Sequence, residues 1–271
     1  MPKITQEQRN RYAAKVKEYK AMADGILAKE QSLLNVLKQP NAQGQGYVRV
    51  SLAEQMLVLT SYQILINSLS VSLLGIKNED SLSEARKSVG RAIKYLEDIV
   101  TGYVDASFSE YEQNLEAIAE IPYEKRYALL RKIGFAIGEI EEGYGANSKW
   151  KWSFVELWGK LAVVAKNSLD LKKAFLDMDL ASPNRMITLS YLAFIKKQLQ
   201  STADRYREKY EVSSMKMDDF KQAILFLNAL KRIHVVFGER TEAEELKRKI
   251  EIWSAKLESD QKKREEEAKK R

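Results

Sequence analysis

Apolar side chains recur at helical spacing from near the start of the chain. In residues 5–38 they lie at alternating steps of four and three positions, which places them on one face of an α-helix. The face consists of Tyr12, Val16, Tyr19, Ala23, Ile26, Leu33 and Leu37, with Glu30 as its one polar position. This pattern predicts a long helix that packs into a helical bundle.

The next segment, residues 51–76, is apolar on nearly every side and carries Glu54 as its only charge. We expect this helix at the centre of an N-terminal core, where Leu65→Asp would bury an unpaired charge and abolish soluble expression. Residues 55–76 are also long enough to cross a membrane. Because eight polar side chains in this stretch would be costly in hydrocarbon, a buried core helix is favoured over transmembrane insertion.

Helix starts are predicted by Ser/Thr-x-x-Glu/Gln patterns, whose side chains satisfy free amides of a first turn. These patterns begin at Thr5, Ser51, Ser81 and Thr241. Further helices are expected over residues 81–104, 122–142, 149–177, 183–210, 218–237 and 241–271. The 12 Gly and 4 Pro are too few for the turns of a β-sandwich or barrel. The fold class is therefore all-α, a multi-helix bundle or an irregular array of helical hairpins with eight or nine helices.

Three regions are expected along the chain. Residues 1–121 are predicted to form a helical bundle around the central apolar helix, and residues 122–257 a domain of helical hairpins. Pro122 and the glycine-containing loop at 143–148 mark the region of the boundary. Residues 258–271 form a charged tail, helical or frayed, in which Ala268 is the only apolar residue. With so little apolar surface we expect this tail to be mobile.

Residues 218–257 are predicted to form two amphipathic helices joined by a tight turn at Gly238. Their apolar and small positions are Phe220, Ala223, Ile224, Leu227, Leu230, Ala243, Leu246 and Ile250. This hairpin resembles one tetratricopeptide-type repeat, a unit of stacked protein-binding scaffolds. The resemblance implies recognition of other proteins through a helical surface. An ordinary antiparallel helix pair has the same pattern and remains the alternative.

The residue inventory excludes several classes of chemistry. There is no Cys, which excludes disulfides, Cys-ligated metal centres and a cysteine nucleophile. The single histidine, His234, has no Glu-x-x-His partner and lies in an apolar helical stretch, so we interpret it as a half-buried structural residue. No glycine cluster has the pattern of a phosphate-binding loop. We therefore expect no catalytic, cofactor-binding or metal-binding residue, and a protein that is not an enzyme.

The chain carries 45 Lys and Arg against 38 Asp and Glu, a formal charge of +7, which raises the question of a polyanionic partner. The candidate polyanion-binding residues are Lys149, Lys151, Lys196, Lys197, Arg205, Arg207 and Lys209. Lys149 and Lys151 alternate with Trp150 and Trp152, a pattern that also suits stacking on bases. Core packing is the favoured explanation for Trp150 and the apolar positions that follow it at helical spacing.

One further apolar seam lies near the C-terminus. It consists of Leu246, Ile250, Trp253 and Leu257, at steps of four, three and four. Such a seam docks either on the preceding hairpin or on a partner helix, so these four residues are the candidate partner-binding set.

The functional expectation is a non-enzymatic helical interaction or scaffold protein that binds other proteins, or itself, through helix faces. The alternative is a protein that binds nucleic acid or an anionic membrane surface through basic helix faces. The polar first residues favour the cytoplasm, and a mature exported chain that has lost its signal peptide would look the same.

Overall fold

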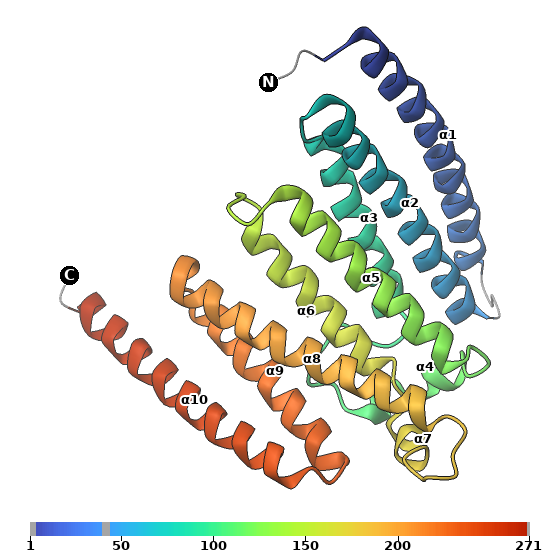
Figure 1. Cartoon of the computed structure of the whole chain (residues 1–271). Helices are drawn as coiled ribbons and strands as arrows, with labels where there is room; N and C mark the ends of the chain where they lie inside the picture. Colours follow the sequence, from blue (N-terminus) through green and yellow to red (C-terminus); the bar gives the residue numbers. More distant parts are fainter. Residues whose placement is uncertain (1–3, 40–43, 270–271) are drawn as a thin grey trace. The chain divides into compact units, whose positions relative to one another are not determined.

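The computed structural model describes residues 4–39 and 44–269, and this part of the chain is built from helices without a β-strand (Figure 1). The all-α class is confirmed. The helices are α1 (Gln6–Leu37), α2 (Gln45–Leu74), α3 (Glu79–Glu97), α4 (Glu112–Glu116), α5 (Tyr123–Tyr144), α6 (Lys151–Asn167), α7 (Leu171–Leu176), α8 (Arg185–Lys209), α9 (Met217–Val236) and α10 (Arg240–Lys269). Eight of them are long, and the short helices α4 and α7 bring the number in the described residues to ten. A 3₁₀ turn (η1, Phe108–Glu110) and a π-helical turn (η2, Tyr210–Ser214) complete the chain.

One of the four predicted helix starts has the expected geometry. At the start of α1, Thr5 Oγ1 accepts a hydrogen bond from the Gln8 amide at 3.2 Å, and Gln8 Oε1 accepts one from the Thr5 amide at 2.8 Å. These reciprocal bonds form a complete capping box and fix the first turn.

Two of the other three predicted starts lie inside their helices, and the third is within one residue of the observed start. Helix α2 already begins at Gln45, so Ser51 lies inside it. Helix α3 is capped by Asn78, whose side chain accepts from the Ser81 amide. Thr241 lies within the first turn of α10. A Ser/Thr-x-x-Glu pattern also occurs within helices, where the backbone amides are already bonded, and the pattern alone does not distinguish the two positions.

The chain divides into two compact units. The first contains the described residues of Met1–Gly102 and Ser109–Leu157, and the second those of Tyr103–Phe108 and Trp158–Arg271. This division differs from the boundary expected near Pro122, because α5 packs against α2 and α3 inside the first unit. Pro122 precedes a helix, but the apolar face of that helix continues the first core.

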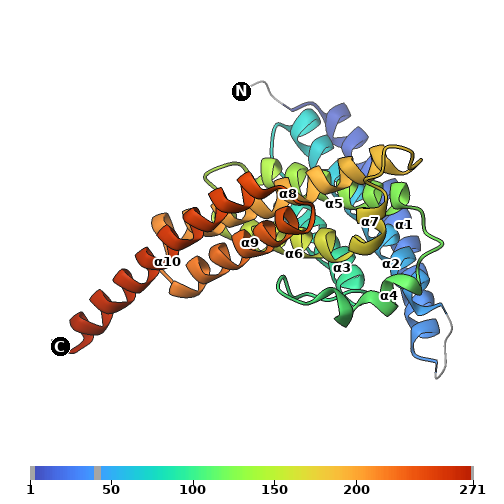
Figure 2. The ribbon, with the colours of Figure 1, turned by 90° about the horizontal axis from the view of Figure 1, so that it is seen from below.

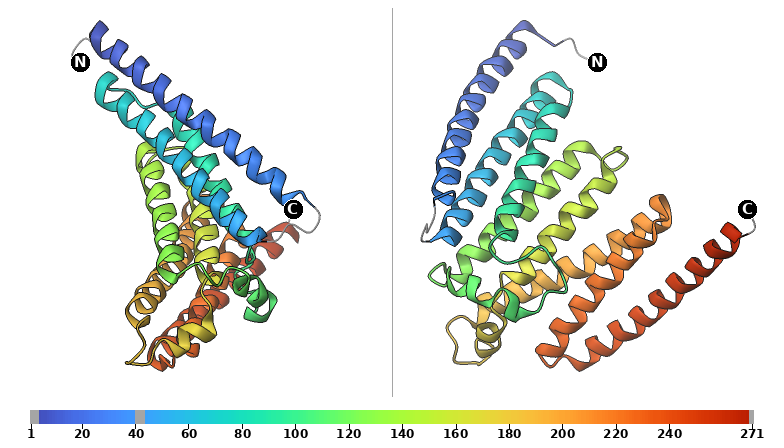
Figure 3. Two further views of the ribbon diagram at one scale, coloured as in Figure 1. Left: turned by 90° about the vertical axis from the view of Figure 1, so that its right-hand side faces the viewer. Right: turned by 180° about the vertical axis from the view of Figure 1, so that it is seen from behind.

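Helix α2 is the centre of the first unit, where it packs against α1, α3 and α5 (Figures 1 and 3). The core side chains include Leu52, Met56 and Ile66 on α2, Val89 and Ile93 on α3, and Ile133, Ile137 and Ile140 on α5. Each fully buried side chain of this size contributes about 1.5–3 kcal/mol of transfer free energy. Leu65, in contrast, is 42% exposed, so Leu65→Asp would place its charge in solvent. The expectation that this substitution buries a charge is therefore wrong, because one stripe of α2 is not covered by its neighbours.

Glu30, the polar position on the apolar face of α1, joins α1 to α3. Its side chain is 2% exposed, and its two oxygens accept from Arg91 Nη1 and from the Tyr95 hydroxyl, each at 2.6 Å. Hydrogen bonds to a charged carboxylate are among the stronger ones in proteins. Burial, together with the hydrogen bond to Glu30, raises the pKa of Tyr95 far above its ordinary value, so this hydroxyl remains a donor at neutral pH.

In the second unit, α9 packs against both α8 and α10 (Figure 3). The turn between α9 and α10 contains Gly238 at φ +74°, a backbone conformation that glycine adopts without strain. Residues 218–257 thus form an antiparallel helical hairpin. Figure 2 shows α10 as one uninterrupted helix that continues well beyond this hairpin.

Removal of the Glu30 carboxylate is expected to destabilise the first unit. Glu30→Ala leaves Arg91 and Tyr95 without their acceptor and should lower the free energy of unfolding by about 1.5–3 kcal/mol, measured by urea denaturation. The matched control is Glu18→Ala, which removes an exposed pair with Lys15 on the same helix and should change little. Equal effects of the two substitutions would contradict this role for Glu30.

Candidate interaction site

The predicted apolar seam on α10 is packed inside the second unit. Trp253 is 4% exposed and its ring lies 5.7 Å from that of Phe220 on α9. Leu246 is also buried, and Ile250 and Leu257 are half-buried. In the structure this seam packs against the preceding helix of the hairpin, which is one of the two alternatives expected for it. Leu246 and Trp253 are therefore core residues, whereas Ile250 and Leu257 at the edge of this contact keep part of their surface exposed.

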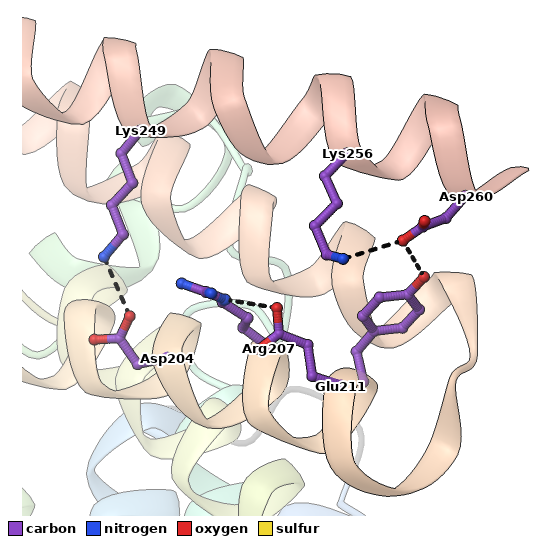
Figure 4. Close-up of polar contacts among 7 residues, drawn as sticks. Asp204, Arg207, Glu211, Lys249, Lys256 and Asp260 are labelled. Carbon is purple, nitrogen blue, oxygen red and sulfur yellow. Dashed lines mark hydrogen bonds and ion pairs between the residues drawn. The ribbon is translucent and has the colours of Figure 1, made fainter.

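Beyond the seam, α10 is held by polar contacts (Figure 4). Asp260 accepts a hydrogen bond from the Tyr210 hydroxyl at 2.8 Å and pairs with Lys256 at 3.4 Å. Arg264 donates to the backbone oxygen of Met215, at the end of the π-helical turn η2. Residues 258–269 are thus helical, one of the two states expected for this tail, and Asp260 and Arg264 supply its contacts to the rest of the second unit. The mobility of the tail stays a prediction. The spacing of apolar residues along the chain could not predict these polar contacts of Asp260 and Arg264.

Most of the candidate polyanion-binding residues of α8 face carboxylates. Arg207 pairs with Glu211 at 3.0 Å, as Figure 4 shows. Lys196 contacts Glu239 at 2.6 Å, and Lys209 contacts Asp219 at 2.7 Å. These ion pairs neutralise three of the five cations, so α8 does not present a continuous basic face.

The remaining candidate cations are separated from one another. Lys197 is exposed on α8, and the Arg205 guanidinium lies 5.2 Å from the centre of the Trp158 ring. Lys149 and Lys151 lie 5.4 and 4.6 Å from the centres of the Trp150 and Trp152 rings. These two lysines belong to the first unit and α8 to the second, so the sequence-predicted set does not form one site within either unit.

His234 is largely buried and lies against Glu239, and its expected structural role stays a prediction. The side chain is 12% exposed, and Nδ1 lies 2.5 Å from Glu239 Oε2. Burial alone would raise the pKa of Glu239, but Lys196 and His234 both stabilise its charged form and lower the pKa below its ordinary value. The described residues contain no cluster of three or more His, Asp or Glu side chains placed to hold a metal ion.

The first unit contains an open groove that the sequence did not predict. It has a volume of about 730 Å³ and runs between α2 and α5. Its lining consists of Leu57, Ser61, Ile64, Leu65 and Ser68 from α2, and of Ala128, Arg131, Lys132, Phe135, Ala136 and Glu139 from α5. Phe135 is 70% exposed, an unusual position for a phenylalanine ring in a chain that has cores to receive it.

The α2 wall of this groove is apolar in effect. It has no charged residue, and the hydroxyls of Ser61 and Ser68 donate to the backbone oxygens of Leu57 and Ile64, at 3.1 and 3.0 Å. These hydroxyls are therefore satisfied within their own helix and expose small side chains to the groove.

The α5 wall carries opposite charges at its two ends. Arg131 and Lys132 lie one turn before Phe135, and Glu139 lies one turn after it. No ion pair of Lys132 or Glu139 occurs within residues 4–39 and 44–269. The wall thus presents an apolar centre between a basic and an acidic end.

The signal for this groove is present in the sequence, but it is ambiguous. Ala128 and Phe135 of α5, and Val58 and Leu65 of α2, are apolar positions two turns apart, as on a core face. On the same faces, the positions between and after them are charged on α5 and serines on α2, so the apolar pattern is incomplete. Helix α2 is long and apolar enough to cross a membrane by length and composition, with a third of its most apolar window buried. Apolar spacing identifies a face that needs cover, and it does not identify what covers it.

Replacement of Tyr210 by phenylalanine tests the polar docking of α10. The hydrogen bond from Tyr210 lowers the pKa of Asp260 below its ordinary value. The stability that this carboxylate contributes is therefore present above its unfolded pKa of about 3.9 and is lost as the pH falls through the lower folded value. Tyr210→Phe should cost about 0.5–1.5 kcal/mol near pH 7, and progressively less as the solution is acidified toward about pH 3.

The measurement is urea denaturation of both proteins across this pH range. Tyr62→Phe is the control, since the Tyr62 hydroxyl makes no hydrogen bond within the part of the chain that the structure describes. A cost of Tyr210→Phe that does not change between neutral and acidic pH would contradict the proposed link to Asp260.

Comparison with known proteins identifies the family of the chain. A family model described as the TP0443 family matches residues 8–261, so the chain belongs to this family. Comparisons with curated proteins and with solved structures gave no match. Membership of the family by itself assigns no chemistry to the groove or to α8.

Proposed function

We propose that this member of the TP0443 family is a non-enzymatic, helical protein-binding protein, whose binding site is the α2/α5 groove of the first unit. The observation that carries the proposal is the exposure of Phe135 and Leu65 on facing walls of one open groove. Contiguous exposed apolar surface with a polar rim is typical of protein-interaction sites.

The groove has the features of a receptor for an amphipathic helix. Two packed helices form its walls, so the floor is rigid and the cost of ordering it on binding is small. Large aromatic side chains are enriched among the residues that dominate interface energies, and Phe135 is the largest exposed side chain in this groove. Arg131, Lys132 and Glu139 form a charged rim that orients a partner.

The alternative, binding of nucleic acid or an anionic membrane surface, has less support. Lys196, Arg207 and Lys209 are paired with carboxylates, and each phosphate contact by one of them would have to break an ion pair. A polyanion-binding function predicts a steep logarithmic dependence of affinity on salt, whereas apolar helix docking does not. We assign no catalytic residue, cofactor or metal to the protein.

Phe135→Asp is expected to abolish partner binding without unfolding the protein. The new charge occupies a solvent-exposed position, so the far-UV circular dichroism and the urea midpoint should remain close to wild type. Affinity capture from the native source, followed by mass spectrometry, should recover specific proteins with the wild-type chain and lose them with Phe135→Asp. The matched control is Leu180→Asp, at an exposed apolar residue of the second unit, which should retain them.

Retention of the same set of proteins by Phe135→Asp would contradict the assignment of the groove. Loss of them with both variants would show a dependence on surface hydrophobicity in general and would also count against this site.

A further inference from the structure

We propose that the occupant of the α2/α5 groove is a second copy of this chain, paired with the first by a two-fold axis that passes near Phe135. The inference rests on the proposed function, because it names the partner of the same groove. Three features of the described residues support this occupant: the order of charges on α5, the shape of the α2 wall, and the exposed aromatic ring between them.

The charges on α5 are complementary to those of a second α5 helix that runs in the opposite direction. Arg131 lies four positions before Phe135, and Glu139 lies four positions after it. A two-fold axis near Phe135 places two α5 helices antiparallel, so the basic end of each helix faces the acidic end of the other. A parallel arrangement would instead bring Arg131 and Lys132 of the two copies together, and like charges that face one another disfavour association. The charges of this face thus select the antiparallel, two-fold pairing.

The α2 wall offers a receptor for an aromatic ring. Ser61, Ile64, Leu65 and Ser68 have the i, i+3, i+4, i+7 spacing of the four residues that surround a hole on a helix surface. The two serines are small and their hydroxyls already donate to backbone oxygens of α2, so the hole accepts an apolar group without leaving a donor unsatisfied.

Phe135 supplies the matching knob. Its ring is 70% exposed within the chain, and in the two-fold pairing the Phe135 of each copy enters the α2 hole of the other. The contact then occurs twice, once on each side of the axis, as an isologous interface requires. Val58, which is also exposed on α2, extends the apolar surface along the same helix face.

Charge reversal tests this pairing directly by sedimentation equilibrium. Wild type is expected to form dimers. Arg131→Glu/Lys132→Glu makes the α5 face acidic at both ends, and Glu139→Lys makes it basic at both ends. Each variant alone should weaken self-association by roughly tenfold or more, because like charges then face one another in the dimer. An equimolar mixture of the two variants should recover dimers, since each basic end again faces an acidic end.

Lys197→Glu, an exposed charge reversal on α8, is the control and should leave the dimer intact. Phe135→Asp should give a monomer with wild-type circular dichroism. All of the reversed charges are on exposed or half-exposed positions, so the recovery in the mixture also excludes misfolding as the cause of weakened association.

Three outcomes would overturn the proposal. A wild-type chain that is monomeric at all concentrations has no such pairing, and in that case the capture experiment with Phe135→Asp still decides whether the groove binds another protein. A dimer that persists with Phe135→Asp uses a different face. Binding of a monomeric wild-type chain to phosphatidylcholine vesicles, lost with Phe135→Asp, would identify a lipid surface as the cover of the groove.

Discussion

The first unit depends on the burial of α2, a helix with no polar face. Apolar surface is stabilising only where another group removes it from water, so each side of this helix requires a neighbour. Helices α1, α3 and α5 supply three of them. Within residues 4–39 and 44–269 the stripe that contains Leu65 stays partly exposed, and it forms one wall of the groove. The groove thus results from a helix that carries more apolar surface than its own unit covers.

In the second unit, apolar surface of α10 is covered within the unit itself, where Trp253 lies against Phe220. The following turns have almost no apolar side chains and are held by Asp260 and Arg264 instead. The expected binding seam is therefore internal, whereas the expected core helix α2 supplies the free apolar surface. The two units show that apolar periodicity alone does not distinguish a core from an interface.

Local features of the fold could be predicted from the sequence, and tertiary ones could not. The helical class and the polar position of Glu30 in α1 follow from periodicity, which reports backbone conformation. The ion pairs of Lys196 with Glu239 and of Lys209 with Asp219 join different helices, and no spacing along one helix reveals them. The wrong starts at Ser51 and Ser81 have a local cause, since the same residue pattern occurs at a cap and inside a helix.

The central claim is that a second copy covers the α2/α5 groove, and the absence of Cys from the chain allows a direct measurement of that cover. A single Ser68→Cys substitution places one thiol in the groove, and Ser201→Cys places one on an exposed position of α8. The rate of reaction with a small maleimide is then measured over a range of protein concentrations. The Ser68→Cys thiol should react progressively more slowly as the concentration rises, while the Ser201→Cys rate remains constant. Equal and concentration-independent rates for the two thiols would contradict the claim.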